Sequence, residues 1–201
     1  FYRDLFFILL AGEDYPRALS VSERIIELDR TGGEGWAMRG VSLARIGRVR
    51  EAEFFMTAKI ATSSSSPLVW QIFGEYHLGS GNLPEAEKSF LTALEHDPAH
   101  AGSVHGLIRV YNAEKRHQDI IALCEKQIAA GSPDSGFLLR KGDAEFALGR
   151  IPQAVRTYEQ YLTRVPENTG VLKCVARCQI KLKKNQDAAK TLEVLLEKGE
   201  A

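Results

Sequence analysis

The sequence predicts an all-α solenoid of antiparallel helix pairs, and three observations support this prediction. A period of 34 residues runs through almost the whole chain, so that Trp36 recurs as Trp70 and Gly40 recurs as Gly74. Each period contains two stretches in which apolar residues follow helical spacing. A helix-breaking position separates the two stretches. A fixed period of this length is typical of solenoids, in which each repeat buries its apolar face only against its neighbours.

The period divides the chain into consecutive repeats. With Trp36 at position 4 of a repeat, a partial repeat is followed by further repeats without gaps, at residues 1–32, 33–66, 67–100, 101–134, 135–168 and 169–201. We expect all of them to form a single solenoid. Because the chain starts at Phe1 rather than at methionine, we also expect it to be part of a longer protein.

The helices can be placed in order along each repeat. In the partial repeat, the apolar run Leu5–Ala11 predicts a core helix, and Pro16 marks the first turn of a second helix, where a missing N–H does no harm. Pro84 and Pro152 occupy the same position in later repeats. In the repeat 67–100, Gly81 and the asparagine after it break the chain between the two helices.

Three repeats depart from this pattern. The repeat 33–66 ends in Ser63–Ser66 instead of a closing turn. The repeat 101–134 has Ile108 where its neighbours have glycine and Cys124 where they have an aromatic residue. The last repeat has Ala176 in the glycine position and Lys183 where glycine would end the first helix.

The recurring residues indicate how the helices pack. Glycine in the first helix allows a close approach of two helices, at Gly40, Gly74 and Gly142. Alanine does the same in the second helix, at Ala18, Ala52, Ala86, Ala154 and Ala188. Larger apolar residues are expected to fill the remaining space, at Met56, Phe90, Tyr158 and Leu192.

This pattern resembles the tetratricopeptide repeat family, whose consensus is W-x2-L-G-x2-Y, then A-x3-F, then alanine and proline. The repeat 67–100 reads WQIFGEYH, then AEKSF, then Ala93 and Pro98. The repeat 135–168 matches with Gly142, Gly149, Ala154, Tyr158 and Pro166. The resemblance covers essentially all 201 residues. It implies a right-handed superhelix whose first helices line a concave groove for a protein partner.

The resemblance also implies which residues face the groove, because positions 2, 5, 9, 12 and 13 of each repeat usually do. The candidate partner-binding residues at these positions are Gln71, Glu75, His105, Arg109, Asn112, Asp143, Phe146, Lys173, Arg177 and Lys181. The early part of the groove is small and apolar, with Glu75 at its edge, and the later part is mainly basic. We therefore expect a peptide or helix with one apolar end and one acidic end. The carboxylate clamp by which some family members bind chaperone tails is not reproduced.

Composition and motifs argue against other classes of function. The 26 basic and 26 acidic residues cancel, which gives no electrostatic case for nucleic acid. The longest apolar run is far shorter than a membrane span, so we expect no membrane insertion within this segment. We expect no catalytic residues, no cofactor and no metal, because no nucleophile motif or phosphate loop is present and Cys174 and Cys178 lack further ligands nearby.

The leading hypothesis is a non-enzymatic scaffold that holds a partner in its groove and assembles a multiprotein complex. One alternative is a non-catalytic targeting or regulatory region of a larger enzyme. Another is self-assembly through the apolar ends Phe1–Leu10 and Val194–Leu196. The odd cysteine count favours a reducing compartment, so we expect a cytoplasmic location, or a periplasmic one if a signal precedes Phe1.

Overall fold

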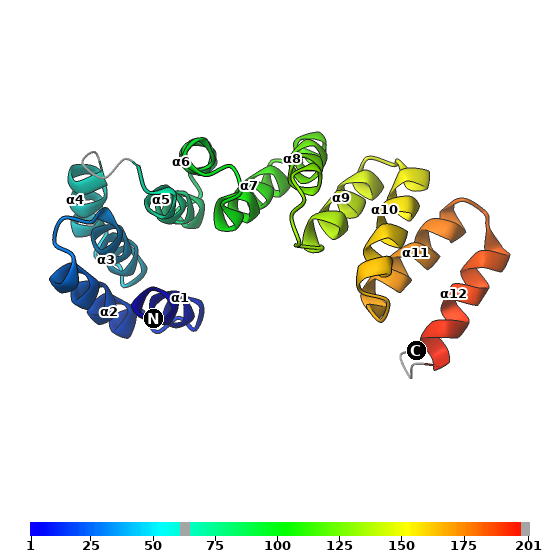
Figure 1. Ribbon diagram of the computed structural model, residues 1–201, viewed down its shortest axis with the longest axis horizontal. Helices are drawn as coiled ribbons and strands as arrows, with labels where there is room; N and C mark the ends of the chain where they lie inside the picture. Colours follow the sequence, from blue (N-terminus) through cyan, green and yellow to red (C-terminus); the bar gives the residue numbers. More distant parts are fainter. Residues whose placement is uncertain (61–64, 198–201) are drawn as a thin grey trace. The chain divides into compact units, whose positions relative to one another are not determined.

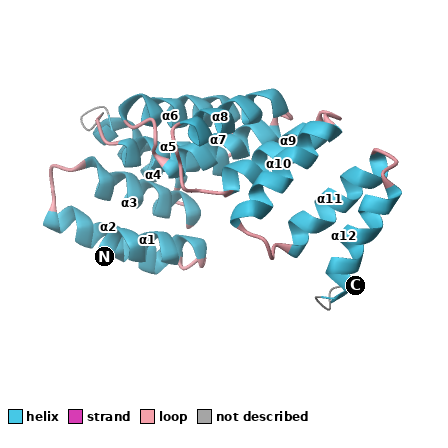
Figure 2. Cartoon of the chain, turned by 45° about the vertical axis from the view of Figure 1, so that its right-hand side comes forward, coloured by secondary structure: helices cyan, strands magenta, loops and turns pink. Residues whose placement is uncertain are grey.

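The computed structural model describes residues 1–60 and 65–197, and in these residues it contains helices and loops but no strand (Figure 2). The helices are α1 (Tyr2–Ala11), α2 (Tyr15–Leu28), α3 (Gly33–Arg45), α4 (Val49–Ile60), α5 (Pro67–Gly79), α6 (Leu83–His96), α7 (Ala101–Ala113), α8 (His117–Ala129), α9 (Gly136–Ala147), α10 (Ile151–Arg164), α11 (Thr169–Lys181) and α12 (Asn185–Glu197). The predicted all-α architecture with two helices per repeat is confirmed.

The chain forms two compact units, which we describe separately. Unit 1 comprises residues 1–110 and unit 2 comprises residues 111–201. In unit 1, α3 contacts α2, α4 and α5, so that the first helices of successive repeats lie side by side (Figure 1). In unit 2, α9 contacts α8 and α10, and α11 contacts α10 and α12. In each unit, these helices therefore pack in a row against near neighbours in sequence.

The helix boundaries follow the predicted period. The helices α3, α5, α7 and α11 begin at residues 33, 67, 101 and 169, and α9 begins one residue later than the period predicts, at Gly136. Asp134 accepts a hydrogen bond from the backbone N–H of Gly136 at 2.7 Å, which closes the turn before α9. Of the serine run that departs from the pattern, Ser63 and Ser64 lie outside the described residues.

The turn inside each repeat uses the same backbone conformation. The residue at position 15 has a positive φ, between +58° and +86°, in all six repeats: Glu13, Gly47, Gly81, Lys115, Gly149 and Lys183. This left-handed conformation is easy for glycine and unfavourable for other residues. The turn geometry is thus set by the repeat and is adopted even where glycine is absent.

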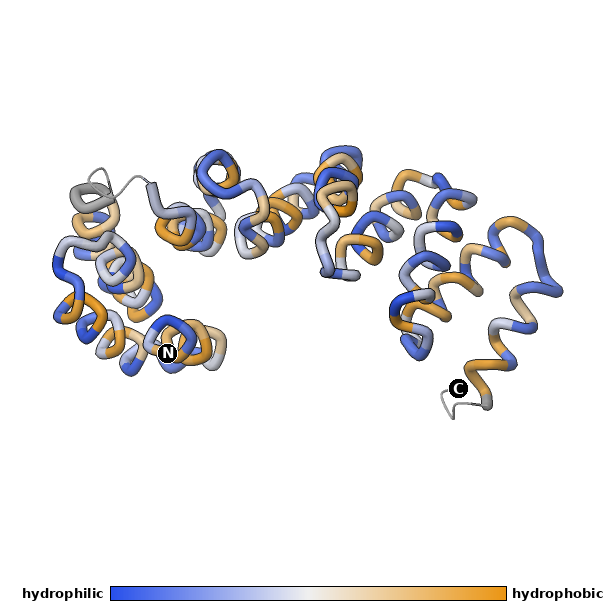
Figure 3. Tube along the Cα trace, viewed as in Figure 1, coloured by the Kyte–Doolittle hydropathy of each residue, from blue (hydrophilic) through white to orange (hydrophobic). Residues whose placement is uncertain are grey.

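The predicted packing positions are mostly buried. All five repeat alanines are at most 2% exposed, and hydrophobic and hydrophilic stretches alternate along the helices (Figure 3). A Cβ atom added at Gly142 would lie 2.6 Å from the Tyr158 ring, and one added at Gly74 would overlap the Phe90 ring. The glycines therefore make room for the large residues of the second helices, as predicted.

One packing prediction is wrong. Leu192 is 41% exposed, whereas Met56, Phe90 and Tyr158, at the same position of earlier repeats, are at most 2% exposed. Leu192 is exposed because this position is normally covered by the first helix of the next repeat. The Phe90 ring lies against Gly74 of its own repeat and also against Gly106 of the next first helix. Leu192 belongs to the last described helix, and no later helix of the described residues covers it.

Candidate functional site

A pocket on the first helices of unit 1 is the best-formed candidate site, and we call it the groove pocket. Its volume is about 320 Å³. Its walls come from four helices, α1, α3, α5 and α7, through the residues Phe6, Phe7, Leu10, Ala11, Val41, Arg45, Gln71, Ile72, Glu75 and Arg109. A smaller hollow of about 180 Å³ adjoins it and shares Val41 and Arg45.

The period explains why these helices contribute to one pocket. Phe7, Val41, Glu75 and Arg109 are separated by successive steps of 34 residues, so all four occupy position 9 of their repeats. Because equivalent residues of stacked repeats point the same way, they form a row across α1, α3, α5 and α7. The sequence predicted Gln71, Glu75 and Arg109 as groove residues, and the structure brings these three together in the groove pocket.

The groove pocket has an apolar floor and a polar rim. Phe6, Val41 and Ile72 are at most 2% exposed and form the floor. The rim carries Arg45 and Gln71, together with charged residues of α5 and α7. Such a pocket suits an apolar side chain whose neighbouring polar groups can reach the rim.

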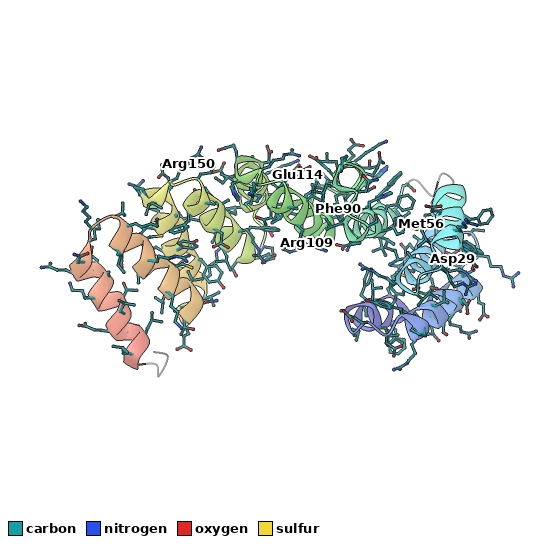
Figure 4. All side chains as sticks on the ribbon, turned by 180° about the vertical axis from the view of Figure 1, so that it is seen from behind. Asp29, Met56, Phe90, Arg109, Glu114 and Arg150 are labelled. Atoms are coloured by element: carbon teal, nitrogen blue, oxygen red, sulfur yellow. The ribbon has the colours of Figure 1, made fainter. Side chains whose placement is uncertain are left out.

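The two charged residues of the rim are paired with each other. Nη1 of Arg109 donates hydrogen bonds to both carboxylate oxygens of Glu75, at 2.8 and 2.7 Å (Arg109 is labelled in Figure 4). The Arg109 side chain is 57% exposed and the Glu75 side chain 25% exposed. The sequence had suggested that Glu75 lies at the edge of an apolar region and that Arg109 belongs to a separate basic region. In the structure the two charges neutralise each other inside the groove pocket.

None of the pocket residues on α1 was predicted from the sequence, although a signal was present for Phe7, Leu10 and Ala11. The groove positions were assigned only to the complete repeats. Extending the same period backwards into the partial repeat places Phe7 at position 9, Leu10 at position 12 and Ala11 at position 13. All three line the groove pocket.

In unit 2, three other predicted residues come together between α9 and α11. The guanidinium Cζ of Arg177 lies 4.6 Å from the centre of the Phe146 ring, and Nζ of Lys181 lies 5.5 Å from the same centre. We call Phe146, Arg177 and Lys181 the cation cluster. Lys173 lies on α11 and is exposed.

Asp143, also predicted as a groove residue, has a partner within its own repeat. The buried Tyr158 donates a hydrogen bond from its hydroxyl to Asp143 Oδ1 at 2.8 Å. Burial raises the pKa of Tyr158 strongly, and the hydrogen bond to Asp143 raises it further. The hydroxyl therefore stays protonated and keeps Asp143 as its acceptor.

Two of the predicted groove residues lie outside the groove pocket. His105 and Asn112 are exposed on α7, and neither lines the groove pocket. Cys178 is buried, and burial raises its pKa, whereas Cys174 is half-buried. Burial also raises the pKa of Cys124 to about 12. Within residues 1–60 and 65–197, no group of three or more His, Cys, Asp or Glu side chains is arranged to hold a metal ion.

Among the helices of residues 1–60 and 65–197, none is both long enough and apolar enough to cross a bilayer.

The geometry defines a helical-repeat protein, and comparison with known proteins identifies the family. The family model for the tetratricopeptide repeat matches residues 73–134 and 139–201. The chain therefore belongs to the tetratricopeptide repeat family. Among curated proteins, no sequence matches the chain.

Solved structures show the same fold at low sequence identity. A crystal structure of MamA matches with a TM-score of 0.59 and 18% identity over 81% of this chain and 88% of that chain. A tetratricopeptide repeat protein from Parabacteroides merdae matches with a TM-score of 0.64 and 14% identity over 98% and 78%. The Cut9–Hcn1 structure of the APC/C matches with a TM-score of 0.61 and 16% identity over 96% of this chain and 38% of that chain. These similarities describe the fold alone.

Proposed function

We propose that this chain is an interaction scaffold that binds a peptide or helix of a partner protein on the first-helix face of unit 1. The groove pocket is the observation that carries this proposal. It combines a buried apolar floor with a rim of Arg45, Gln71, Glu75 and Arg109. Tetratricopeptide repeats generally act as non-catalytic protein-binding modules, and a row of equivalent positions on stacked first helices suits an elongated partner.

In this proposal the groove pocket anchors the partner, and the polar rim orients it. An apolar side chain that fills the pocket removes apolar surface from water, which supplies affinity. The side chain of Gln71 packs over Gly102 at the rim and offers both a donor and an acceptor to a partner backbone. By holding such a segment, the chain assembles its partner into a larger complex.

The test uses a tryptophan that blocks the groove pocket without disturbing the core. Ala11 lies exposed at the pocket wall, and Ala122 lies exposed on α8 of unit 2. Peptides are first selected from a displayed random library on the unmodified chain. We expect Ala11→Trp to weaken their binding by about tenfold or more, equivalent to about 1.4 kcal/mol. Ala122→Trp is the matched control and should bind them as the unmodified chain does.

Equal binding of the selected peptides by both variants would place the binding surface outside the groove pocket. Thermal unfolding of both variants shows whether the fold is retained, so that a loss of binding can be assigned to the blocked pocket.

A further inference from the structure

The cation cluster of unit 2 is a concentrated positive charge on a single helix face. The helix α11 carries Lys173, Arg177 and Lys181 but no acidic residue. Arg177 and Lys181 both lie over the ring of Phe146 on α9. Cations over an aromatic face are attracted by the ring's negative potential, which holds their side chains in place.

The charged residues at the equivalent positions of unit 1 interact differently from those of the cation cluster. Glu75 and Arg109 occupy position 9 of adjacent repeats and form an ion pair. Asp143 and Arg177 occupy the same position two repeats later, yet Asp143 accepts the Tyr158 hydroxyl and Arg177 lies on Phe146. Over the part of the chain that the structure describes, neither Arg177 nor Lys181 forms an ion pair with a carboxylate.

Arg177 is exposed and keeps most of its N–H donors available to a partner. Its Cζ lies over the Phe146 ring, and its five N–H donors line the edge of a rigid planar fork. Nη2 of Arg177 lies 3.9 Å from the sulfur of Cys174, which is a weak acceptor. A carboxylate could accept two parallel N–H bonds from this edge, and Lys181 adds a second positive charge beside it.

We propose that the cation cluster binds carboxylate groups of an acidic peptide segment in the partner protein. This inference rests on the proposed scaffold function and names the chemistry of a second contact, separate from the groove pocket. Peptide carboxylates fit better than a nucleic acid or a lipid surface, because the chain has equal numbers of basic and acidic residues and the exposed Asp143 lies on α9 beside Phe146. A polyanion with many phosphates would require a more extended basic surface.

The experiment compares two fluorescein-labelled peptides by fluorescence anisotropy on the full chain. One alternates leucine and glutamate, and the other has glutamine in place of every glutamate. We expect the glutamate peptide to bind at least about tenfold more tightly than the glutamine peptide at low salt, and the difference to shrink as salt screens the charges.

Two double variants test the location of the contact. Arg177→Gln with Lys181→Gln should abolish the preference for glutamate. Arg156→Gln with Lys190→Gln removes the same charge from exposed positions of α10 and α12 and should retain it. Phe146→Leu keeps an apolar side chain but removes the ring, and it should reduce the preference by a few fold, since Arg177 is then less ordered.

Two outcomes would overturn the proposal. Equal losses in the two double variants would show that only net charge matters. Tighter binding of oligouridylate RNA or of phosphatidylserine vesicles, lost in the Arg177 and Lys181 variant alone, would assign the cluster to another class of partner. Ala11→Trp should leave the glutamate preference intact, so a failure of the groove pocket and a failure of the cation cluster are distinguishable.

Discussion

At the scale of single residues, glycine positions decide how closely the helices pack. Gly74 and Gly79 both lie in α5, but their surroundings differ. A Cβ at Gly74 would overlap the rigid, buried ring of Phe90, whereas a Cβ at Gly79 would meet only the exposed end of the Arg45 side chain. We therefore expect Gly74→Ala to lower the free energy of unfolding by about 1–3 kcal/mol through overpacking.

Gly79→Ala serves as the control for this prediction, because Arg45 can move aside and alanine favours the helix. Chemical denaturation measures both variants. A Gly74→Ala protein as stable as Gly79→Ala would contradict the packing that we describe. Adding Phe90→Leu to Gly74→Ala should recover part of the loss, since the smaller side chain leaves room for the methyl group.

A second residue-scale contrast explains why the groove pocket and the cation cluster differ in charge. Glu75 accepts hydrogen bonds from Arg109, whereas the shorter Asp143 accepts one from the Tyr158 hydroxyl. The longer side chain of Glu75 neutralises Arg109, whereas the shorter Asp143 is bonded to the Tyr158 hydroxyl and leaves Arg177 available. We expect Tyr158→Phe to free Asp143 and to weaken binding of the glutamate peptide by about threefold or more, through competition for Arg177.

Binding of that peptide by Tyr158→Phe at the affinity of the unmodified chain would refute this competition. Tyr161→Phe is the matched control, because the Tyr161 hydroxyl accepts a hydrogen bond from Asn168, outside the cation cluster.

At the scale of the element, the turn between the paired helices stores a small strain in half of the repeats. Lys115 has φ of 58° and Lys183 has φ of 59°, where Gly47, Gly81 and Gly149 occur in the other repeats. We expect Lys115→Gly to raise the free energy of unfolding by about 1 kcal/mol, because glycine adopts the left-handed region without steric cost. Urea denaturation measures the change.

The control for this substitution is Lys126→Gly, which introduces the same residue into the exposed face of α8. This substitution should lower the free energy of unfolding by about 1 kcal/mol, since glycine is unfavourable within a helix. If both substitutions destabilise the chain, the left-handed geometry at position 15 is not a source of strain.

The helix starts offer a similar test. The side chain of Asn82 accepts a hydrogen bond from the backbone N–H of Glu85 and caps α6. Arg150 occupies the equivalent position before α10 and makes no such bond. We expect Arg150→Asn to stabilise the chain by about 0.5–1 kcal/mol. Arg156→Asn, in the exposed middle of α10, should not stabilise it, and thermal unfolding compares the two.

Much of the fold could be predicted at this scale, because the helices repeat a pattern that depends only on neighbouring residues. The period placed the starts of α3, α5, α7 and α11, and the small residues marked the close contacts. The sites were predicted less completely. The period identifies which residues share a face, but it cannot show that Arg109 pairs with Glu75 or that Arg177 lies over the Phe146 ring, since these contacts depend on side-chain conformation.

At the scale of the whole molecule, the two units have separate cores and need not respond alike to pH. Burial lowers the pKa of His77 and of His100 below the usual value of 6.5, and the nearby Glu85 and Asp97 offset only part of this effect. Both histidines belong to unit 1. The folded state therefore binds fewer protons than the unfolded state near pH 6. Their contribution to stability is complete above pH 6.5 and decreases as the pH falls through 6.5 towards the lowered values.

Tryptophan fluorescence can follow this effect in one unit, because both tryptophans, Trp36 and Trp70, lie in unit 1. We expect the urea midpoint measured by fluorescence to be lower at pH 5.5 than at pH 7.5. The change should be smaller in the variant His77→Gln with His100→Gln, which has no imidazole to protonate at these positions. A pH shift of the same size in this variant would assign the effect to other groups.

The ring of Phe90, which lies against Gly74 of its own repeat and Gly106 of the next, has a consequence for how such a chain can lengthen or shorten. Tandem duplication of residues 67–100 alone would place Ile72 of the new copy where Gly106 now accommodates the ring. Duplication of residues 67–134 would keep each Phe90 beside its Gly106 and bring Ile72 against the smaller Cys124 at the new junction. The repeat 67–100 can therefore be duplicated without repacking of Phe90 only together with the repeat 101–134, whose Gly106 accommodates the ring.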